Sequence, residues 1–243
     1  MINERIVIEE KTKDYNEAWI ETYFWQESEE LYPGQKRPVI VICPGGAYGM
    51  TSDREAEAIA VRFMGMGYHA VVLRYSVAPA RYPVALRQLA KTVALLRENS
   101  DKWHIEKNKI IVSGFSAGGH LAASLGVFWN TEELAGITGM ENERIRPNGM
   151  ILNYPVITSG EVGHEESFRN LLGDRYEELK DRMSLEFQVR KIHPEPLSGI
   201  PLRIRRCCWI IHFSLFRHSI KRAFQWSIMF FRRDPMGSAW QMS

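Results

Sequence analysis

The sequence has few cysteines and no hydrophobic run long enough to cross a membrane. Its three cysteines, Cys43, Cys207 and Cys208, include an adjacent pair and cannot build a disulfide framework, which favours a reducing compartment. No stretch of about 18 apolar residues occurs, and the charged start of the chain, Met1 to Arg5, does not resemble a signal peptide. We therefore expect a cytoplasmic protein with no membrane partner.

Signals for bound metals and nucleotides are missing as well. No group of histidine, cysteine and aspartate residues has the spacing of metal ligands, and neither a G-x-G-x-x-G nor a Walker-type loop occurs. We expect no metal and no cofactor. A hydrophobic content of 45% and a charged content of 25% are typical of a folded globular protein.

Charge is unevenly distributed along the chain. From Leu197 to Ser243 there are eight basic residues and one acidic residue, so this part carries about +7 although the whole chain carries +2. Residues 1–196 then carry about −5. We predict one domain over 1–196 and an aberrant basic tail over 197–243.

Strand and helix patterns alternate through the first part of the chain. Apolar and β-branched runs predict strands, and amphipathic or glycine-bounded runs predict helices. Strands are expected over 5–9, 18–25, 39–43, 68–75, 109–113 and 149–154, and helices over 52–66, 83–98 and 116–128. Strands separated by helices predict an α/β fold, a doubly wound and mostly parallel sheet with helices on both faces.

The start of the helix expected over 52–66 carries a capping signal. Ser52 is the expected N-cap, with Glu55 as its capping-box partner three residues on. The charged group Asp53, Arg54 and Glu55 has a second interpretation, because these side chains could orient the preceding loop through salt bridges.

The strongest chemical signal is Gly114-Phe115-Ser116-Ala117-Gly118, a G-x-S-x-G between a predicted strand and a predicted helix. In that context it predicts a nucleophile elbow, a tight turn that projects the serine hydroxyl above the sheet. Gly114 and Gly118 leave room for close backbone approach. The N–H of Ala117, at the helix start, can face a developing oxyanion. The alternative is a tight strand-to-helix turn without chemistry.

A second loop of small residues, Pro44-Gly45-Gly46-Ala47-Tyr48, follows the buried run over 39–43. Hydrolases with a nucleophile elbow place another oxyanion donor in a loop after an earlier strand. Small side chains let N–H groups face a substrate carbonyl. Taken alone the loop could be a plain turn, but two matching loops in this order favour the chemical interpretation.

On these motifs the sequence resembles the acetyl-esterase and carbohydrate-esterase group of α/β hydrolases, which is related to the hormone-sensitive-lipase type. The resemblance runs from about Val39 to about Val189. It rests on the loop over 44–48 and on Ser52-Asp53-Arg54-Glu55, the run 73–79, Tyr82-Pro83, the run 114–121 and Asn153-Tyr154-Pro155-Val156-Ile157. One departure is Pro44, which stands where the lipase-type loop has histidine.

The resemblance implies a role for each of several residues. Ser116 is the implied nucleophile of a two-step acyl transfer to water. The implied oxyanion hole is formed by the N–H groups of Gly46, Ala47 and Ala117, and the implied structural glycines are Gly45, Gly114 and Gly118. The implied substrates are small esters, such as acetylated sugars or xylan fragments. Nothing in the sequence indicates an oligomeric state.

An α/β hydrolase also needs an acid and then a histidine after the serine. The acidic candidates Glu186 and Glu195 follow no convincing strand, and no aspartate occurs between positions 182 and 233. His120 lies on the helix after the predicted nucleophile and is expected to point away from it. The remaining histidines are not favoured as the base: His164, expected in a solvated loop, and His193, His212 and His218. We assign no acid and no base.

The tail offers an explanation for this absence. When the possible codons of residues 235–241 are read one base earlier, they permit His-Gly-Leu-Gly-Leu-Ala, which resembles the terminal histidine motif of the family. The same offset permits Val-Phe-Pro across 229–232 and Trp-His-Thr-Ala-Glu-Asp across 198–204, resembling the strand and acid loop. We therefore hypothesise a one-base frameshift near residues 189–197. It would disrupt the C-terminal strands and helix of the fold and leave Ser116 without a base.

Two other functions stay open. An intact α/β pocket could bind an ester or a sugar without cleaving it. The tail could be an arm for nucleic acid or a membrane, because Trp209, Phe213, Phe216 and Trp226 lie among arginines. The shifted frame explains the same residues without selection for binding, so we expect no nucleic-acid partner.

Overall fold

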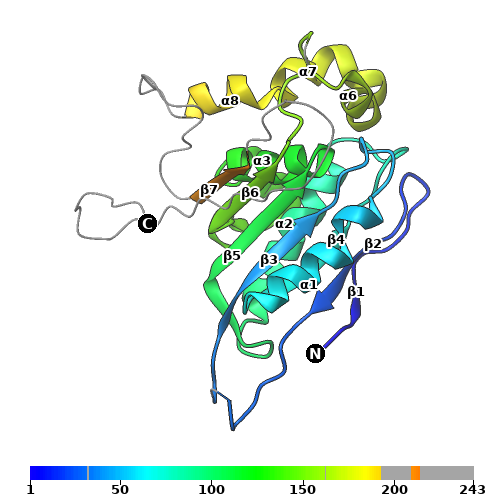
Figure 1. The fold of residues 1–243 in the computed structure, drawn as a ribbon. Helices are drawn as coiled ribbons and strands as arrows, with labels where there is room; N and C mark the ends of the chain where they lie inside the picture. Colours follow the sequence, from blue (N-terminus) through cyan, green and yellow to red (C-terminus); the bar gives the residue numbers. More distant parts are fainter. Residues whose placement is uncertain (32, 162, 193–208, 214–243) are drawn as a thin grey trace.

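A seven-stranded sheet with helices against both faces forms the body of the protein (Figure 1). The computed structural model describes residues 1–31, 33–161, 163–192 and 209–213. The strands are β1 (Arg5–Glu9), β2 (Ala18–Tyr23), β3 (Arg37–Cys43), β4 (His69–Arg74), β5 (Ile105–Phe115), β6 (Gly149–Asn153) and β7 (Trp209–Phe213). The helices are η1 (Asp53–Glu55), α1 (Glu57–Gly65), α2 (Val84–Glu98), α3 (Ala117–Phe128), α4 (Glu132–Thr138), α5 (Asn142–Ile145), α6 (Glu165–Leu172), η2 (Gly173–Arg175), α7 (Tyr176–Met183) and α8 (Leu185–Ile192).

The order of strands across the sheet is β1-β2-β4-β3-β5-β6-β7. The strands from β4 to β7 in this order pair in parallel, whereas β1 and β2 form an antiparallel edge. This confirms the predicted doubly wound, mostly parallel α/β sheet. From β3 the chain runs to β4 on one side and returns to β5 on the other. The carboxyl ends of β3 and β5 therefore form a topological switch point, where α/β sheets usually bind ligands.

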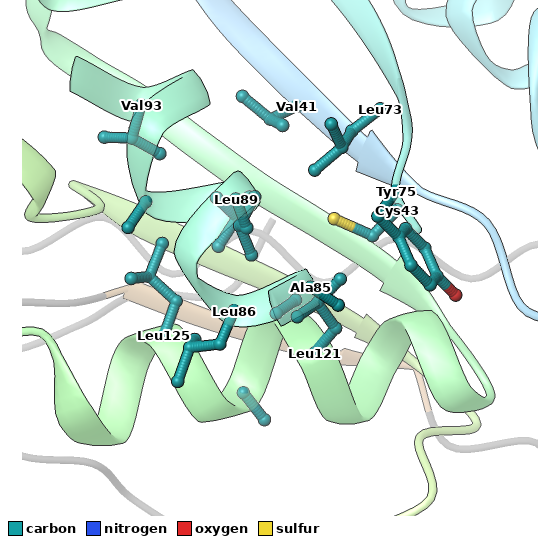
Figure 2. Close-up of a cluster of buried hydrophobic side chains, with 14 of the residues drawn as sticks. Val41, Cys43, Leu73, Tyr75, Ala85, Leu86, Leu89, Val93, Leu121 and Leu125 are labelled. Atoms are coloured by element: carbon teal, nitrogen blue, oxygen red, sulfur yellow. The ribbon is translucent and has the colours of Figure 1, made fainter. Parts of the chain in front are cut away.

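Each face of the sheet has its own hydrophobic core, because successive strand residues point to opposite faces. Val39, Val41 and Cys43 of β3 belong to a large cluster with α2 and α3, while Ile40 and Ile42 belong to a smaller cluster with α1. Figure 2 shows part of the larger cluster, in which side chains from α2, α3, β3 and β4 gather. Coverage of both faces explains the continuous apolar run over 39–43.

The six predicted strands and the helices after 83 and 116 are present within a few residues of their expected ends. The helix expected over 52–66 is different. It begins as the 3₁₀ turn η1, breaks at Ala56 (φ −114°, ψ −105°) and continues as α1 from Glu57. Ser52 makes no side-chain cap hydrogen bond, so the predicted capping box is wrong. The Glu55 carboxylate accepts its hydrogen bonds from other segments instead, as described below.

Neither α4 and α5 nor the helices after β6 were predicted from the sequence. Figure 1 shows α6, α7 and α8 grouped beyond one end of the sheet. Asn170 of α6 donates to the carbonyl of Ala47, and His120 of α3 is hydrogen-bonded to the carbonyl of Met183 in α7. These contacts place the three helices at the carboxyl ends of the parallel strands.

The tail contributes one described strand. In β7, Trp209 to Phe213 pair in parallel with Gly149 to Asn153 of β6. The expected disruption of the C-terminal strands is therefore wrong for these five residues, which extend the sheet. The predicted boundary at 196–197, and Glu195, His193, Cys207, Cys208 and His218, lie outside the described residues. Within the described part of the chain, no helix has the length and apolar character needed to span a membrane.

Candidate active site

Ser116 lies at the junction between β5 and α3, in a backbone conformation that few side chains adopt. Its φ of +51° and ψ of −117° are unusual for a residue other than glycine. Two segments hold this turn: the Ser116 N–H donates to the carbonyl of Asn153 (3.1 Å), and the Ser116 carbonyl accepts from the N–H of Val156 (3.0 Å) and of His120 (3.1 Å). The side chain is partly exposed, and its hydroxyl makes no hydrogen bond to the described residues.

The predicted structural glycines allow very close contacts around this turn. A β-carbon on Gly114 would lie 2.1 Å from the carbonyl oxygen of Gly118. A β-carbon on Gly118 would lie 2.1 Å from the carbonyl oxygen of Cys43 and 2.4 Å from that of Pro44. Because backbone atoms cannot move aside as a side chain can, these positions require glycine. The helix start is thereby packed directly against the end of β3.

The carbonyl groups of the loop after β3 are all bound by the protein. The accepting residues and their donors are Pro44 from Tyr75 Oη (2.7 Å), Gly45 from Ser52 N (2.9 Å), Gly46 from Gly49 N (2.9 Å) and Met50 N (3.1 Å), Ala47 from Asn170 Nδ2 (3.0 Å), and Tyr48 from Ala78 N (2.8 Å). The φ angle is positive at Gly46 (+130°), Ala47 (+55°) and Tyr48 (+56°). This backbone conformation separates the bound carbonyl groups from the N–H groups of the loop.

Several of those N–H groups are left without a protein acceptor. Within the described residues, the N–H groups of Gly46, Ala47 and Tyr48 donate to no acceptor, and neither does that of Ala117 at the start of α3. Unpaired N–H groups at a helix start and in a loop of positive φ favour an anion. The site therefore has donors suited to negative charge on an oxygen atom.

The two loops are adjacent in space. A β-carbon on Gly45 would lie 3.1 Å from the β-carbon of Ser116 and 2.8 Å from the carbonyl oxygen of Phe115. The structure thus brings the predicted nucleophile together with the loop that carries Gly46 and Ala47. Sequence positions 44–48, 114–118 and 153–156 meet at the switch point between β3 and β5.

His120 is a structural residue, in agreement with its expected orientation. Its Nδ1 accepts from the Tyr48 hydroxyl (2.8 Å), so its Nε2 carries the proton and donates to the Met183 carbonyl (2.8 Å). Complete burial lowers the pKa of His120 to about 4, which keeps the imidazole neutral at physiological pH. With both nitrogens bound in the core, His120 is not available to take a proton from Ser116.

No described hydrogen bond joins the other candidates His164 and Glu186 to Ser116. His164 is exposed and caps α6, where its Nδ1 accepts from the Ser167 N–H (3.3 Å). Glu186 lies on α8, and its Oε2 is buried without a hydrogen-bond partner among the described residues. His212 pairs with Leu152 between β7 and β6. No three or more described histidine, cysteine, aspartate or glutamate side chains are grouped so as to hold a metal ion.

Sequence reasoning gave no role to three residues that build the site. Asn153 donates from its side chain to the carbonyl of Gly114 (3.2 Å), and its own carbonyl accepts from Ser116. Tyr154 follows with φ +35°, and its hydroxyl donates to Glu55. Asn170, on α6, donates to the carbonyl of Ala47 in the loop after β3. The signal for the first two was their place directly after an apolar strand; Asn170 had no local signal.

The curated proteins that the sequence resembles include a protein named as a xylanase and one named as an acetylxylan esterase. The chain is 34% identical over 196 residues to endo-1,4-beta-xylanase B of Butyrivibrio fibrisolvens, covering 70% of this chain and 30% of that protein. It is 33% identical over 138 residues to an acetylxylan esterase of Xylanibacter ruminicola, covering 55% of this chain and 26% of that protein. The chain therefore spans less than a third of the length of these relatives.

The chain covers a larger share of the solved structures that it resembles than of the curated relatives. The acetyl ester-xyloside bifunctional hydrolase of Caldicellulosiruptor lactoaceticus has a TM-score of 0.64 and 29% identity, covering 76% of this chain and 69% of that one. MGS-M1, an α/β hydrolase from a deep-sea metagenome, has a TM-score of 0.58 and 28% identity, covering 88% and 82%. The BD-FAE family model matches residues 30–183. The chain thus has the α/β-hydrolase fold and belongs to the BD-FAE family.

Proposed function

We propose that this protein is a serine esterase that removes small, acetyl-like acyl groups from sugars or xylan fragments. The observation that carries the proposal is the position of Ser116: a partly exposed serine in a strained strand-to-helix turn, beside a loop with unpaired N–H groups. The named activities of its relatives, an acetylxylan esterase and an acetyl ester-xyloside hydrolase, support the same substrate class.

In the proposed reaction, Ser116 Oγ attacks the ester carbonyl carbon and loses its proton to a base. The carbonyl oxygen becomes negatively charged and accepts hydrogen bonds from the N–H groups of Gly46, Ala47 and Ala117. Collapse of this intermediate breaks the bond to the sugar oxygen, which leaves as an alcohol after it takes up a proton. Water then attacks the acyl-enzyme, and the carboxylic acid departs as Ser116 regains its proton.

Neither His120, which is bound in the core, nor His164, which caps a helix, is available as the base for these steps. We propose that residues 197–243 are read out of frame and that the original frame encodes the acid and the histidine. The chain with its present tail is then expected to hydrolyse esters slowly, since a general base typically contributes about 10²–10⁴-fold.

Hydrolysis of p-nitrophenyl acetate by two chains tests both parts of the proposal. One chain is the present protein, and the other is made from a gene with one base inserted between codons 189 and 197. The second is expected to be about 10²–10⁴-fold faster, and Ser116→Ala should abolish its activity. Fluorophosphonate labelling should map to Ser116 in both chains, more slowly in the present one because it lacks the base. A frame-restored chain that neither hydrolyses the ester nor becomes labelled would overturn the assignment.

The competing function is that of a binding protein, which would hold an ester or a sugar without cleaving it. Acetylated xylo-oligosaccharides that bind to both chains, with no acetate released by either, would identify a binding protein. Sequencing of the coding DNA from codon 184 onward settles the frame independently of activity. An intact frame with this tail would contradict the frameshift while leaving the assignment of Ser116 unaffected.

A further inference from the structure

We infer that Glu55 is a positioning residue of this site, whose carboxylate fixes the loop after β3 against the turn that carries Ser116. The Gly45 N–H donates to Glu55 Oε2 (2.7 Å), and the Tyr154 hydroxyl donates to Glu55 Oε1 (2.5 Å). One partly buried carboxylate therefore bridges two segments that are far apart in sequence. This inference rests on the proposed function of Ser116.

Both bridged segments lie beside Ser116. On one side, a β-carbon on Gly45 would lie 2.8 Å from Glu55 Oε2 and 3.1 Å from Ser116 Cβ, so carboxylate and serine flank the same point. On the other side, Tyr154 lies between Asn153 and Val156, whose backbone groups bind the Ser116 N–H and carbonyl. Movement of Glu55 would change the distance between the loop and the serine.

The bond to Glu55 also determines which N–H groups remain free. The carboxylate accepts the Gly45 N–H, so this N–H is already used, while those of Gly46 and Ala47 have no acceptor among the described residues. A hydrogen bond to an ionised carboxylate is roughly twice as strong as one between neutral groups. Glu55 therefore holds the peptide immediately before the free donors, which matches the need for donors that do not reorganise when charge develops.

The neighbouring acid has a different partner, and no capping box forms here, so the role of Glu55 differs from that of a general capping charge. Asp53 forms an ion pair with Arg74 (2.9 Å). Ser52 makes no side-chain cap bond, and the Glu55 N–H donates to the Ser52 carbonyl (3.2 Å), so no capping box competes for the Glu55 carboxylate. Two causes, burial first and the hydrogen bond to Glu55 second, raise the pKa of the Tyr154 hydroxyl. The hydroxyl therefore stays protonated and can donate.

Nuclear magnetic resonance can observe this hydrogen bond directly. The sequence contains two Pro-Gly pairs, Pro33-Gly34 and Pro44-Gly45, so labelling with ¹³C-carbonyl proline and ¹⁵N-glycine yields two correlated amide signals. Both glycines donate to a glutamate, because the Gly34 N–H bonds to Glu27 Oε1 (3.1 Å). We expect Glu55→Gln and Glu55→Ala to move only the Gly45 proton upfield, and the control Glu27→Gln to move only the Gly34 proton.

Fluorophosphonate labelling of the intact protein gives the functional readout. Glu55→Ala is expected to lower the maximal labelling rate by about tenfold or more, with little change in the concentration for half-maximal rate, because the oxyanion donors shift. Glu55→Gln retains one acceptor oxygen and should recover part of that rate. Tyr154→Phe removes one of the two bonds and should cause a smaller loss, and Glu27→Gln none.

The two readouts separate the inference from the proposed function. A Gly45 signal that stays in place in both Glu55 variants would overturn the hydrogen bond, whatever the labelling shows. A Gly45 signal that moves while labelling of Ser116 keeps its rate would overturn the positioning role. Absence of labelling in every chain, with the Gly45 signal moving as expected, would contradict Ser116 as nucleophile and leave the bridge itself supported.

Discussion

Replacing Glu9 with glutamine is expected to destabilise the protein at neutral pH and to have much less effect in acid. Glu9 ends β1, and its side chain is only 7% exposed. Its carboxylate accepts hydrogen bonds from Arg87 (2.8 and 3.0 Å) and Lys91 (2.6 Å), both on α2, and from Gln88 (3.1 Å) between them. The Glu9 carboxylate therefore joins the antiparallel edge of the sheet to α2.

The magnitude follows from the pKa of Glu9. Burial alone would raise it, but the hydrogen bonds from Arg87, Lys91 and Gln88 outweigh burial and lower it from 4.5 to about 2. Each pKa unit corresponds to about 1.4 kcal/mol, so the ionised carboxylate contributes about 3 kcal/mol to the free energy of unfolding. Because the folded-state pKa is the lower one, this contribution is complete above about pH 5 and falls to about 1.4 kcal/mol at pH 3.

Urea unfolding at pH 7 and pH 3 measures this difference. The Glu9→Gln protein should lose about 3 kcal/mol relative to the natural chain at pH 7 and about half of that at pH 3. Glu10→Gln is the matched control, since Glu10 is the exposed next residue and has no ion pair among the described residues. A loss below about 1 kcal/mol at pH 7, or one that is equal at both pH values, would refute the reasoning.

Two further outcomes are expected. Gly118→Ala should lower the free energy of unfolding, measured with urea, by about 3 kcal/mol or more, because its β-carbon would meet the Cys43 carbonyl at 2.1 Å. The control Gly136→Ala on α4, which has open space around it, should be neutral or stabilising by up to about 1 kcal/mol in the same measurement. The ring-proton signals of His69 and His120, both with pKa lowered to about 4 mainly by burial, should not titrate between pH 8 and pH 5.5. Either signal titrating near pH 6.5 would contradict the described burial.

The sequence was sufficient to predict the central sheet, because its strands are covered on both faces and read as continuous apolar runs. The run over 39–43 and the alternation with α2 and α3 leave few other folds. The surface helices α6 to α8 were missed because their sequences are largely polar and short, and their position depends on contacts such as that between Asn170 and Ala47. Such contacts have no local sequence pattern.

The site was predicted in part for a similar reason. The turn at Ser116 and the loop over 44–48 follow from local residue type, since small residues and strand-to-helix context are visible in sequence. Of the two roles predicted for Glu55, the capping-box partner is wrong, whereas the second, orienting the preceding loop, agrees with its hydrogen bond to Gly45, although no salt bridge is involved. The spacing from Ser52 is correct for a capping box, but the carboxylate reaches Gly45 and Tyr154 across the fold. Donors that are distant in sequence, such as Gly45 and Tyr154, bind the Glu55 carboxylate in place of the capping box, and the local sequence does not reveal them.

The loop over 44–48 has a further consequence for how the protein tolerates change. Its carbonyl groups are held by the segment after β4, by the loop's own continuation, and by α6. Substitutions in regions separated by more than a hundred positions therefore converge on one peptide segment. Substitution of Asn170 on the outer helix α6 is therefore expected to disturb the geometry beside the serine.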